Sequence, residues 1–386
     1  MEGVPEWPRP KSPEPPAGRA HRYFGWVGTV LPGVGLALLL ALIGRAASHG
    51  IGVGLLGFAK SPVSDISLAV LLGLAIRNIL GLPAVYEKGL KFCARTVLRG
   101  GIVLLGLRLS LVEAGQVGLT ALPVILACIA TALFFVTRIN RALGLPPRLG
   151  SLIAVGTSIC GVSAIAATAP VIDAEEDEVS YAVACITLFG LIALFIYPFV
   201  AHALFGAAPR LAGIFLGTAI HDTSQVAGAA LMYRQQFQAP DALSAATVTK
   251  LVRNLCMATV IPFIGARYRR AGGPGGTPGV RLRLVEMVPL FVVAFLGAVV
   301  VRTVGDAGPM AFGLLPRDSW QAALAAAETV AAWCLGIAMA SIGLGTGLDR
   351  IRRLGARPMS VGLLAALLVG GVSAALLSLY AALNVG

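Results

Sequence analysis

The chain has 386 residues, of which 57% are hydrophobic and only 12% are charged. Soluble domains carry about 25% charged residues, so this composition excludes an ordinary soluble protein. The net charge of +12 could suit a nucleic-acid-binding protein. However, the basic residues cluster in short loops between apolar runs, which is the positive-inside pattern of membrane proteins. We therefore expect a lipid bilayer around this chain and no nucleic acid partner.

The apolar runs are continuous and long enough to cross hydrocarbon, which takes roughly 20 residues per helix. A membrane β-barrel would show alternating residues instead. The sequence predicts an all-α polytopic membrane protein with about eleven transmembrane helices. The expected spans are 24–45, 63–81, 91–110, 114–136, 149–172, 179–204, 211–233, 243–265, 284–304, 319–348 and 359–384.

Charge in the loops predicts the orientation of these spans. With a cytoplasmic N-terminus, every basic cluster falls on the cytoplasmic side and the acidic run 173–178 falls outside. The proline-rich segment 1–22 reads as a disordered cytoplasmic tail, and 23–62 reads as the first span with its connection. The cytoplasmic clusters are Lys88 and Lys91; Arg138, Arg141 and Arg148; Arg267, Arg269, Arg270, Arg281 and Arg283; and Arg350, Arg352, Arg353 and Arg357.

Internal similarity predicts two inverted five-helix repeats, 63–204 and 205–386, as in many transporters. Segment 67–86 aligns with 211–233, so that Gly73 faces Gly217. A basic pair follows each copy in the next span. These pairs are Arg95 with Arg99, and Lys250 with Arg253.

Two segments have the composition of helices that break inside the membrane. Segment 151–172 is rich in glycine and hydroxyl residues, and 337–351 has glycine at alternate positions near its centre. Glycine is a poor helix former, and a break frees backbone groups that can bind an ion. We expect breaks near Gly156–Gly161 and Gly343–Gly347. Close packing of small residues between helices is the alternative.

The segment HDTSQ, residues 221–225, places polar side chains in an apolar span. In a continuous helix Thr218, His221, Asp222 and Gln225 would share one stripe, which should face protein or a wet cavity. The next span carries two basic residues near its middle, Lys250 and Arg253. Either they form a buried ion pair with the aspartate, or they leave positive charge to receive an anion.

The candidate substrate site combines this stripe with the hydroxyls of the first broken segment and the basic residues. Cys160 reads as a packing residue, and the six cysteines form no metal or disulfide pattern. We expect no catalytic residue, metal or cofactor. The candidate substrate-binding residues are Thr157, Ser158, Cys160, Gly161, Ser163, His221, Asp222, Ser224, Gln225, Lys250, Arg253 and Arg99.

Three segments resemble the sulfate exporter family of bacterial inner-membrane proteins. They are VGTSICGVSAIAATAPVI (155–172), LGTAIHDTSQVAGA (216–229) and TVTKLVRN (247–254). The resemblance covers the chain from about residue 25 to its end. It implies a fold similar to the cation:proton antiporter and anion transporter superfamily, with inverted repeats and crossed broken helices. It also implies a bacterial inner-membrane location.

The leading functional hypothesis is a secondary active transporter of a small, sulfate-like anion that works by alternating access. The alternative is a cation:proton antiporter in which the carboxylate of Asp222 exchanges protons and cations. A remote alternative is an intramembrane hydrolase that uses His221 with Ser158 or Ser224. Coupling to protons or sodium and assembly as a homodimer stay open.

Overall fold

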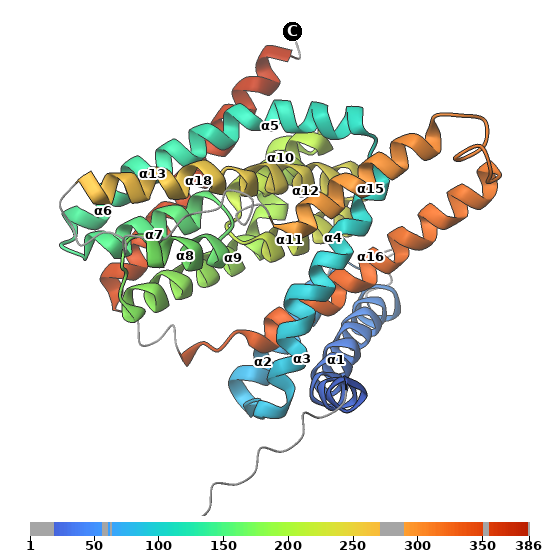
Figure 1. Cartoon of the computed structure of the whole chain (residues 1–386), viewed down its shortest axis with the longest axis horizontal. Helices are drawn as coiled ribbons and strands as arrows, with labels where there is room; N and C mark the ends of the chain where they lie inside the picture. Colours follow the sequence, from blue (N-terminus) through green and yellow to red (C-terminus); the bar gives the residue numbers. More distant parts are fainter. Residues whose placement is uncertain (1–18, 56–60, 62–63, 271–288, 350–354, 385–386) are drawn as a thin grey trace, which may run out of the picture.

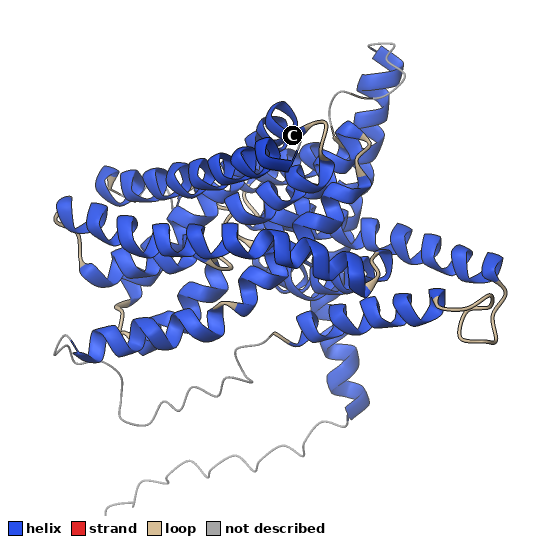
Figure 2. Ribbon diagram, turned by 90° about the horizontal axis from the view of Figure 1, so that it is seen from above, coloured by secondary structure: helices blue, strands red, loops and turns tan. Residues whose placement is uncertain are grey.

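The computed structural model describes residues 19–55, 61, 64–270, 289–349 and 355–384. Across these residues the chain is helical with short connections (Figure 2). Within these described ranges no β-strand is formed, and one isolated bridge joins Ala311 and Leu315. Residues 1–18 of the expected tail and most of the Gly/Pro-rich loop 267–283 lie outside the described residues.

Six of the described helices are long and apolar enough to cross a membrane. Leucine and phenylalanine side chains on them remain exposed, for example Leu119 at 73% and Phe199 at 53%, as expected for surfaces that face lipid. The chain is therefore a helical membrane protein. The six helices are Val27–His49, Leu111–Ala142, Glu176–Phe205, Pro240–Arg270, Arg317–Gly345 and Ala356–Leu383.

The helices form two bundles, which Figure 1 shows side by side. The flanking bundle packs α1, α2, α3, α4, α15 and α16 against one another. Its helices are α1 (Arg19–His49), α2 (Asp65–Ala75), α3 (Glu87–Phe92), α4 (Leu98–Leu105), α15 (Leu290–Asp306) and α16 (Arg317–Gly345). Shorter π and 3-10 turns extend them: η1 (Gly50–Leu55), η2 (Ile76–Leu80), η3 (Ala84–Tyr86), η4 (Cys93–Val97) and η5 (Gly106–Arg108).

The central bundle contains both interrupted helices, and the larger buried apolar cluster runs from it into the flanking bundle. Helix α11 joins the two bundles, because it packs on α9 and α12 and also on α2 and α16. The members of the central bundle are α5 (Leu111–Thr131), η6 (Ala132–Val136), α6 (Thr137–Ala142), α7 (Pro147–Ser158), α8 (Val162–Thr168), η7 (Ala169–Val171), α9 (Glu176–Phe205), α10 (Pro209–Ala219), α11 (Thr223–Phe237), α12 (Pro240–Leu255), α13 (Met257–Arg270) and α18 (Ala356–Asn384).

The break expected near Gly156–Gly161 is confirmed. Helix α7 ends at Ser158 and α8 begins at Val162. Between them Gly161 has φ = 73°, a left-handed conformation that an L side chain adopts only at a cost.

The break expected near Gly343–Gly347 stays a prediction. Helix α16 ends at Gly345, within this range, but residues 350–354, which would show whether a helix resumes, lie outside the described residues. Gly343 lets α16 pack closely on α2, because a Cβ at this position would lie 2.3 Å from the carbonyl oxygen of Val70. Close packing of small residues, the alternative reading, holds at this glycine. The second interruption lies between α10 and α11, at Ile220–Asp222.

The two segments aligned as repeats differ in shape. Residues 65–80 run through α2 and η2 without a break, whereas α10 and α11 are separated. Helical segments lie over each of the eleven expected ranges, but several are short or interrupted. The inverted repeats and the count of eleven transmembrane helices stay predictions.

Candidate functional site at two interrupted helices

The ends of α7 and α10 pose a hydrogen-bonding problem inside the central bundle. The last four carbonyls of a helix have no partner within it, and the residues at these two ends are fully buried, away from water. A neighbouring helix, α12, supplies the missing donors through Lys250 and Arg253. These residues are three apart and so project from the same face of α12.

Arg253 binds the carboxyl ends of both α7 and α10. Its Nε donates to the carbonyl oxygen of Ser158 at 2.6 Å, and Nη2 donates to that of Thr157. Its Nη1 donates to the carbonyl oxygens of Thr218 at 2.8 Å and Ile220 at 3.0 Å. The side chain is fully buried, so the guanidinium is placed as a clamp between two helix ends.

Lys250 binds the next carbonyls along the same two segments. Its Nζ donates to the carbonyl oxygens of Ile159 at 2.9 Å and Ile220 at 3.0 Å, and to that of His221. This side chain is also buried. The two cations therefore complement the partial negative charge at two helix carboxyl ends.

The amino ends of the two helices that follow the breaks, α8 and α11, also meet. Asp222 is the N-cap of α11, and its Oδ1 accepts hydrogen bonds from the backbone N–H of Ser224 at 2.9 Å and from the Ser224 hydroxyl. A Cβ added at Gly161 would lie 2.8 Å from the Asp222 Oδ2. Glycine is needed at 161 both for its backbone conformation and for this approach.

The helical stripe expected through residues 218–225 is wrong, because α10 ends at Ala219 before the polar segment begins. The ion pair with Asp222, one of the two alternatives for the basic residues, is not formed either. Among the described residues, no carboxylate lies within 4.0 Å of Lys250 or Arg253. Backbone carbonyls take the donors that the ion-pair alternative assigned to Asp222.

Several buried polar atoms around the breaks have no hydrogen-bond partner within the described part of the chain. Such atoms are rare in folded proteins and need an explanation. They are both ring nitrogens of His221, the hydroxyl oxygens of Thr157 and Thr249, and the side-chain oxygens of Gln225 and Asn254. Their concentration at the interruptions makes this region the candidate site.

Thr249 and Asn254 join the site although the sequence analysis did not select them. Both lie on α12 beside the basic residues, and Asn254 Nδ2 donates to the hydroxyl of Thr223 at 3.3 Å. Thr249 is four residues before Arg253, and Asn254 is four residues after Lys250. This helical spacing was the signal that could have identified them.

The remaining hydroxyl and thiol candidates have local partners or point away. Ser158 Oγ donates to the carbonyl oxygen of Val155 at 3.3 Å. Cys160 is buried with its Sγ 3.9 Å from Met257 Sδ, in agreement with a packing role. Ser163 is exposed on α8.

Gln225 lies beside the break and Arg99 does not. Gln225 is buried on α11, and its Nε2 donates to the carbonyl oxygen of Thr187 at 3.1 Å. Arg99 is exposed on α4 in the flanking bundle, and its guanidinium lies 5.4 Å from the ring centroid of Phe291. Arg99 therefore stands apart from the other candidates. Across the described residues, no group of three or more His, Cys, Asp or Glu could hold a metal ion.

Comparison with known proteins identifies the family. The family described as "Conserved hypothetical protein 698" matches residues 34–362. The chain belongs to this family. The UPF0324 membrane protein Atu0671 of Agrobacterium fabrum is 32% identical over 356 residues, which cover 92% of this chain and 94% of the relative.

Further relatives also match along most of their length. The UPF0324 inner membrane protein YeiH of Escherichia coli K12 is 30% identical over 345 residues, covering 87% of this chain and 91% of YeiH. The UPF0324 membrane protein spyM18_1033 of Streptococcus pyogenes is 32% identical over 336 residues, covering 86% of this chain and 92% of the relative. No solved structure shows significant similarity to the chain.

Proposed function

We propose that this protein is a secondary active transporter that moves a small anion across the membrane by alternating access. The observation that carries the proposal is the junction of two interrupted helices around two buried cations. Interrupted helices that meet inside the membrane form the ion and substrate sites of many transporters. Polar backbone at that depth is tolerated where it is buried in protein or lines a cavity.

The balance of charge at this junction favours an anion. Lys250 and Arg253 are two full positive charges, and each helix end carries about half an elementary charge. The carboxyl ends of α7 and α10 together offset about one positive charge, and Asp222 offsets another. The amino ends of α8 and α11 then leave a surplus of about one positive charge, which a bound anion would compensate.

The unpaired polar atoms supply ligands for such an anion. The hydroxyls of Thr157 and Thr249, the imidazole N–H of His221 and the N–H groups at the start of α11 are all donors near the break. Because Lys250 and Arg253 already donate to carbonyls, they would act on the anion through their charge. The hydroxyl and imidazole groups would make the direct hydrogen bonds.

The finer features of the proposal rest on the sequence patterns. They are eleven transmembrane helices, two inverted repeats, a cytoplasmic N-terminus and a fold similar to the cation:proton antiporter and anion transporter superfamily. Sulfate or a related oxyanion is the substrate class that the sequence resemblance favours. An inner-membrane location is supported by the relative YeiH, which is named an inner membrane protein.

A cation:proton antiporter is the second candidate, favoured by the position of Asp222. Its carboxylate is half-buried at the junction and has no basic partner within 4.0 Å among the described residues. A carboxylate without an ion-pair partner in that place could bind a cation and a proton in turn. The hydrolase alternative has less support, because both ring nitrogens of His221 lack a hydrogen-bond partner in the described chain.

Transport by the purified full-length protein in liposomes tests the proposal. Labelled sulfate, phosphate and sodium would be offered separately, with and without a pH gradient, and protein-free liposomes would give the background. Saturable uptake of at least one anion is expected. Uptake of sodium in exchange for protons, without uptake of any anion, would replace the proposal with the antiporter.

A further inference from the structure

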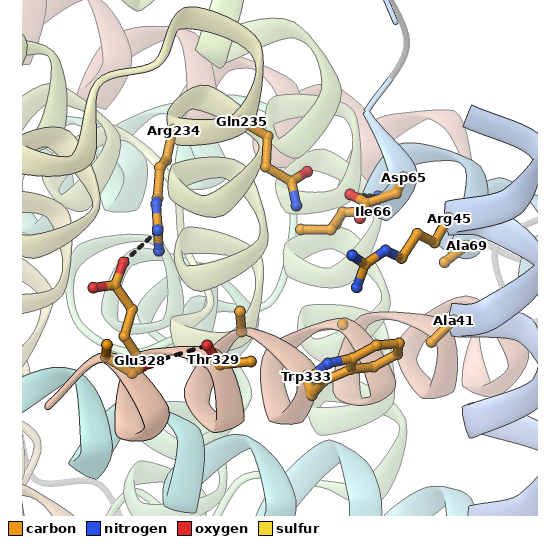
Figure 3. Close-up of a pocket in the computed structure, with 13 residues that line it drawn as sticks. Ala41, Arg45, Asp65, Ile66, Ala69, Arg234, Gln235, Glu328, Thr329 and Trp333 are labelled. Atoms are coloured by element: carbon orange, nitrogen blue, oxygen red, sulfur yellow. Dashed lines mark hydrogen bonds and ion pairs between the residues drawn. The ribbon is translucent and has the colours of Figure 1, made fainter. Parts of the chain in front are cut away.

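A second polar region lies away from the interrupted helices. It is an open cavity of about 500 Å³ where α11 meets α1, α2 and α16 of the flanking bundle (Figure 3). Arg234, which lines the cavity, is eleven residues beyond the start of α11, or about 17 Å along the helix. The residues of the junction are not among those that line this cavity. The lining includes Arg45, Asp65, Arg234, Gln235, Glu328, Thr329 and Trp333, with small apolar residues between them.

The size of the cavity indicates the size of its ligand. A water molecule takes about 30 Å³ in the liquid, so the cavity has room for roughly sixteen waters. A single inorganic oxyanion would leave most of this volume unfilled. Cavities of about 300–1,000 Å³ typically bind small organic molecules, and this cavity lies within that range.

The charges around the cavity favour an anionic ligand. Glu328 Oε1 is shared between two arginines, since it forms an ion pair with Arg234 and lies 3.3 Å from Arg108 Nη1. Asp65 is matched by the amino end of α2, where its Oδ1 accepts from the N–H of Ile66 at 2.8 Å. Among the lining residues Arg45 and Arg234 balance Asp65 and Glu328. Arg108, which pairs with Glu328 but is not part of the lining, adds one unit of positive charge.

Arg45 lies where it could bind the anionic group of such a ligand. In Figure 3 its guanidinium points into the cavity from α1. No carboxylate of the described residues lies within 4.0 Å of it. Its Cζ instead lies 5.2 Å from the ring centroid of Trp333, an arrangement that orients the guanidinium. An arginine fork held in this way suits a planar carboxylate.

Much of the remaining lining is apolar. Trp333 presents its indole ring, and alanine or glycine lines the cavity at positions 41, 69, 325, 332 and 336. Gln235 and Thr329 add neutral hydrogen-bonding groups to the lining. A ligand with a flat apolar body and one anionic group would match both halves of this lining.

We propose that the cavity between α1, α2, α11 and α16 binds an organic monoanion, with its carboxylate at Arg45 and its apolar body against Trp333. This site is separate from the junction of the interrupted helices. Its test measures binding alone, so its failure would leave the transport proposal standing.

Benzoate is the probe, and benzamide is the uncharged control of the same shape. Binding is measured by calorimetric titration of the purified full-length protein in detergent. Benzoate should bind at least about tenfold more tightly than benzamide, because a charge-assisted hydrogen bond to arginine is lost with the amide. Equal binding of the two compounds, or no binding of benzoate, would overturn the proposal.

Two variants locate the site, each with a matched control. Arg45→Gln should weaken benzoate binding at least about tenfold, whereas Arg210→Gln, at an exposed arginine on α10, should not. Gly336→Leu should block the cavity without disturbing the helix, because a Cβ there meets no atom within 4 Å. Gly100→Leu, equally open on α4, is its control.

Thermal unfolding of each variant confirms that it is folded before binding is measured. Unchanged benzoate binding in folded Arg45→Gln and Gly336→Leu proteins would show that benzoate binds elsewhere and would refute the site. Sulfate is titrated in the same way. Sulfate that binds at this site as tightly as benzoate would refute the preference for an organic ligand.

Discussion

Replacing Arg253 with alanine should destabilise the whole central bundle. The change leaves the carbonyl oxygens of Thr157, Ser158 and Thr218 without their side-chain donor, whereas the carbonyl oxygen of Ile220 keeps its hydrogen bond from Lys250. Each buried carbonyl left without a partner costs about 1–3 kcal/mol. The variant no longer has to bury a charged guanidinium, which offsets part of this sum. We therefore expect the free energy of unfolding to fall by about 3–5 kcal/mol, the usual result of breaking a buried charged network.

Thermal unfolding in detergent measures this loss. The entropy of unfolding is about 2.1 cal/mol/K per residue, so for 386 residues the expected decrease in Tm is about 4–6 °C. Arg253→Lys keeps the charge but not the planar fork, and should lose about half as much. The control is Arg99→Ala, which removes an exposed side chain and should change Tm by less than about 1 °C.

A folded Arg253→Ala protein that unfolds at the wild-type temperature would refute this reasoning. It would show that the ends of α7 and α10 do not depend on the clamp. An equal decrease in Tm for Arg99→Ala would also contradict it, because the effect would then follow the loss of any arginine.

Two further predictions test the geometry of the junction. Gly161→Ala should destabilise the protein by more than about 1 kcal/mol, because the residue has φ = 73° and its Cβ would meet Asp222. The control is Gly115→Ala, in an open helical position, which should be neutral or stabilising in the same thermal assay. Thr249→Val should leave Tm unchanged or raise it, because the buried hydroxyl has no hydrogen-bond partner among the described residues. The same change should weaken binding of labelled sulfate by roughly tenfold. Lower stability with unchanged sulfate binding would show that this hydroxyl has a structural role instead.

The sequence was sufficient to predict a helical membrane protein and one of the two helix breaks. Composition predicts the class, and the glycines of 156–161 predict the first break. The second break could not be predicted from propensity, because Ile220, His221 and Asp222 include neither glycine nor proline. It depends on long-range hydrogen bonds from α12, which a local pattern does not contain.

The sequence predicted that four polar residues lie together, but not how they interact. His221, Asp222, Lys250 and Arg253 lie together as expected. However, opposite charges on neighbouring spans suggested an ion pair, whereas the helix ends took the cationic donors. Which acceptor a buried arginine finds depends on where the backbone is interrupted, so the pairing could not be deduced without the second break.

The most direct test of the central claim, an anion site at the two interrupted helices, is labelled sulfate uptake by Asp222→Asn protein in liposomes. Asparagine caps a helix about as well as aspartate, so α11 should stay intact and the variant should unfold near the wild-type temperature. Removal of a negative charge beside the anion predicts uptake equal to the wild-type rate or up to about threefold faster. Loss of uptake in the folded variant, with sodium–proton exchange in the wild type that also disappears, would contradict the anion site and establish the aspartate as an exchanging carboxylate.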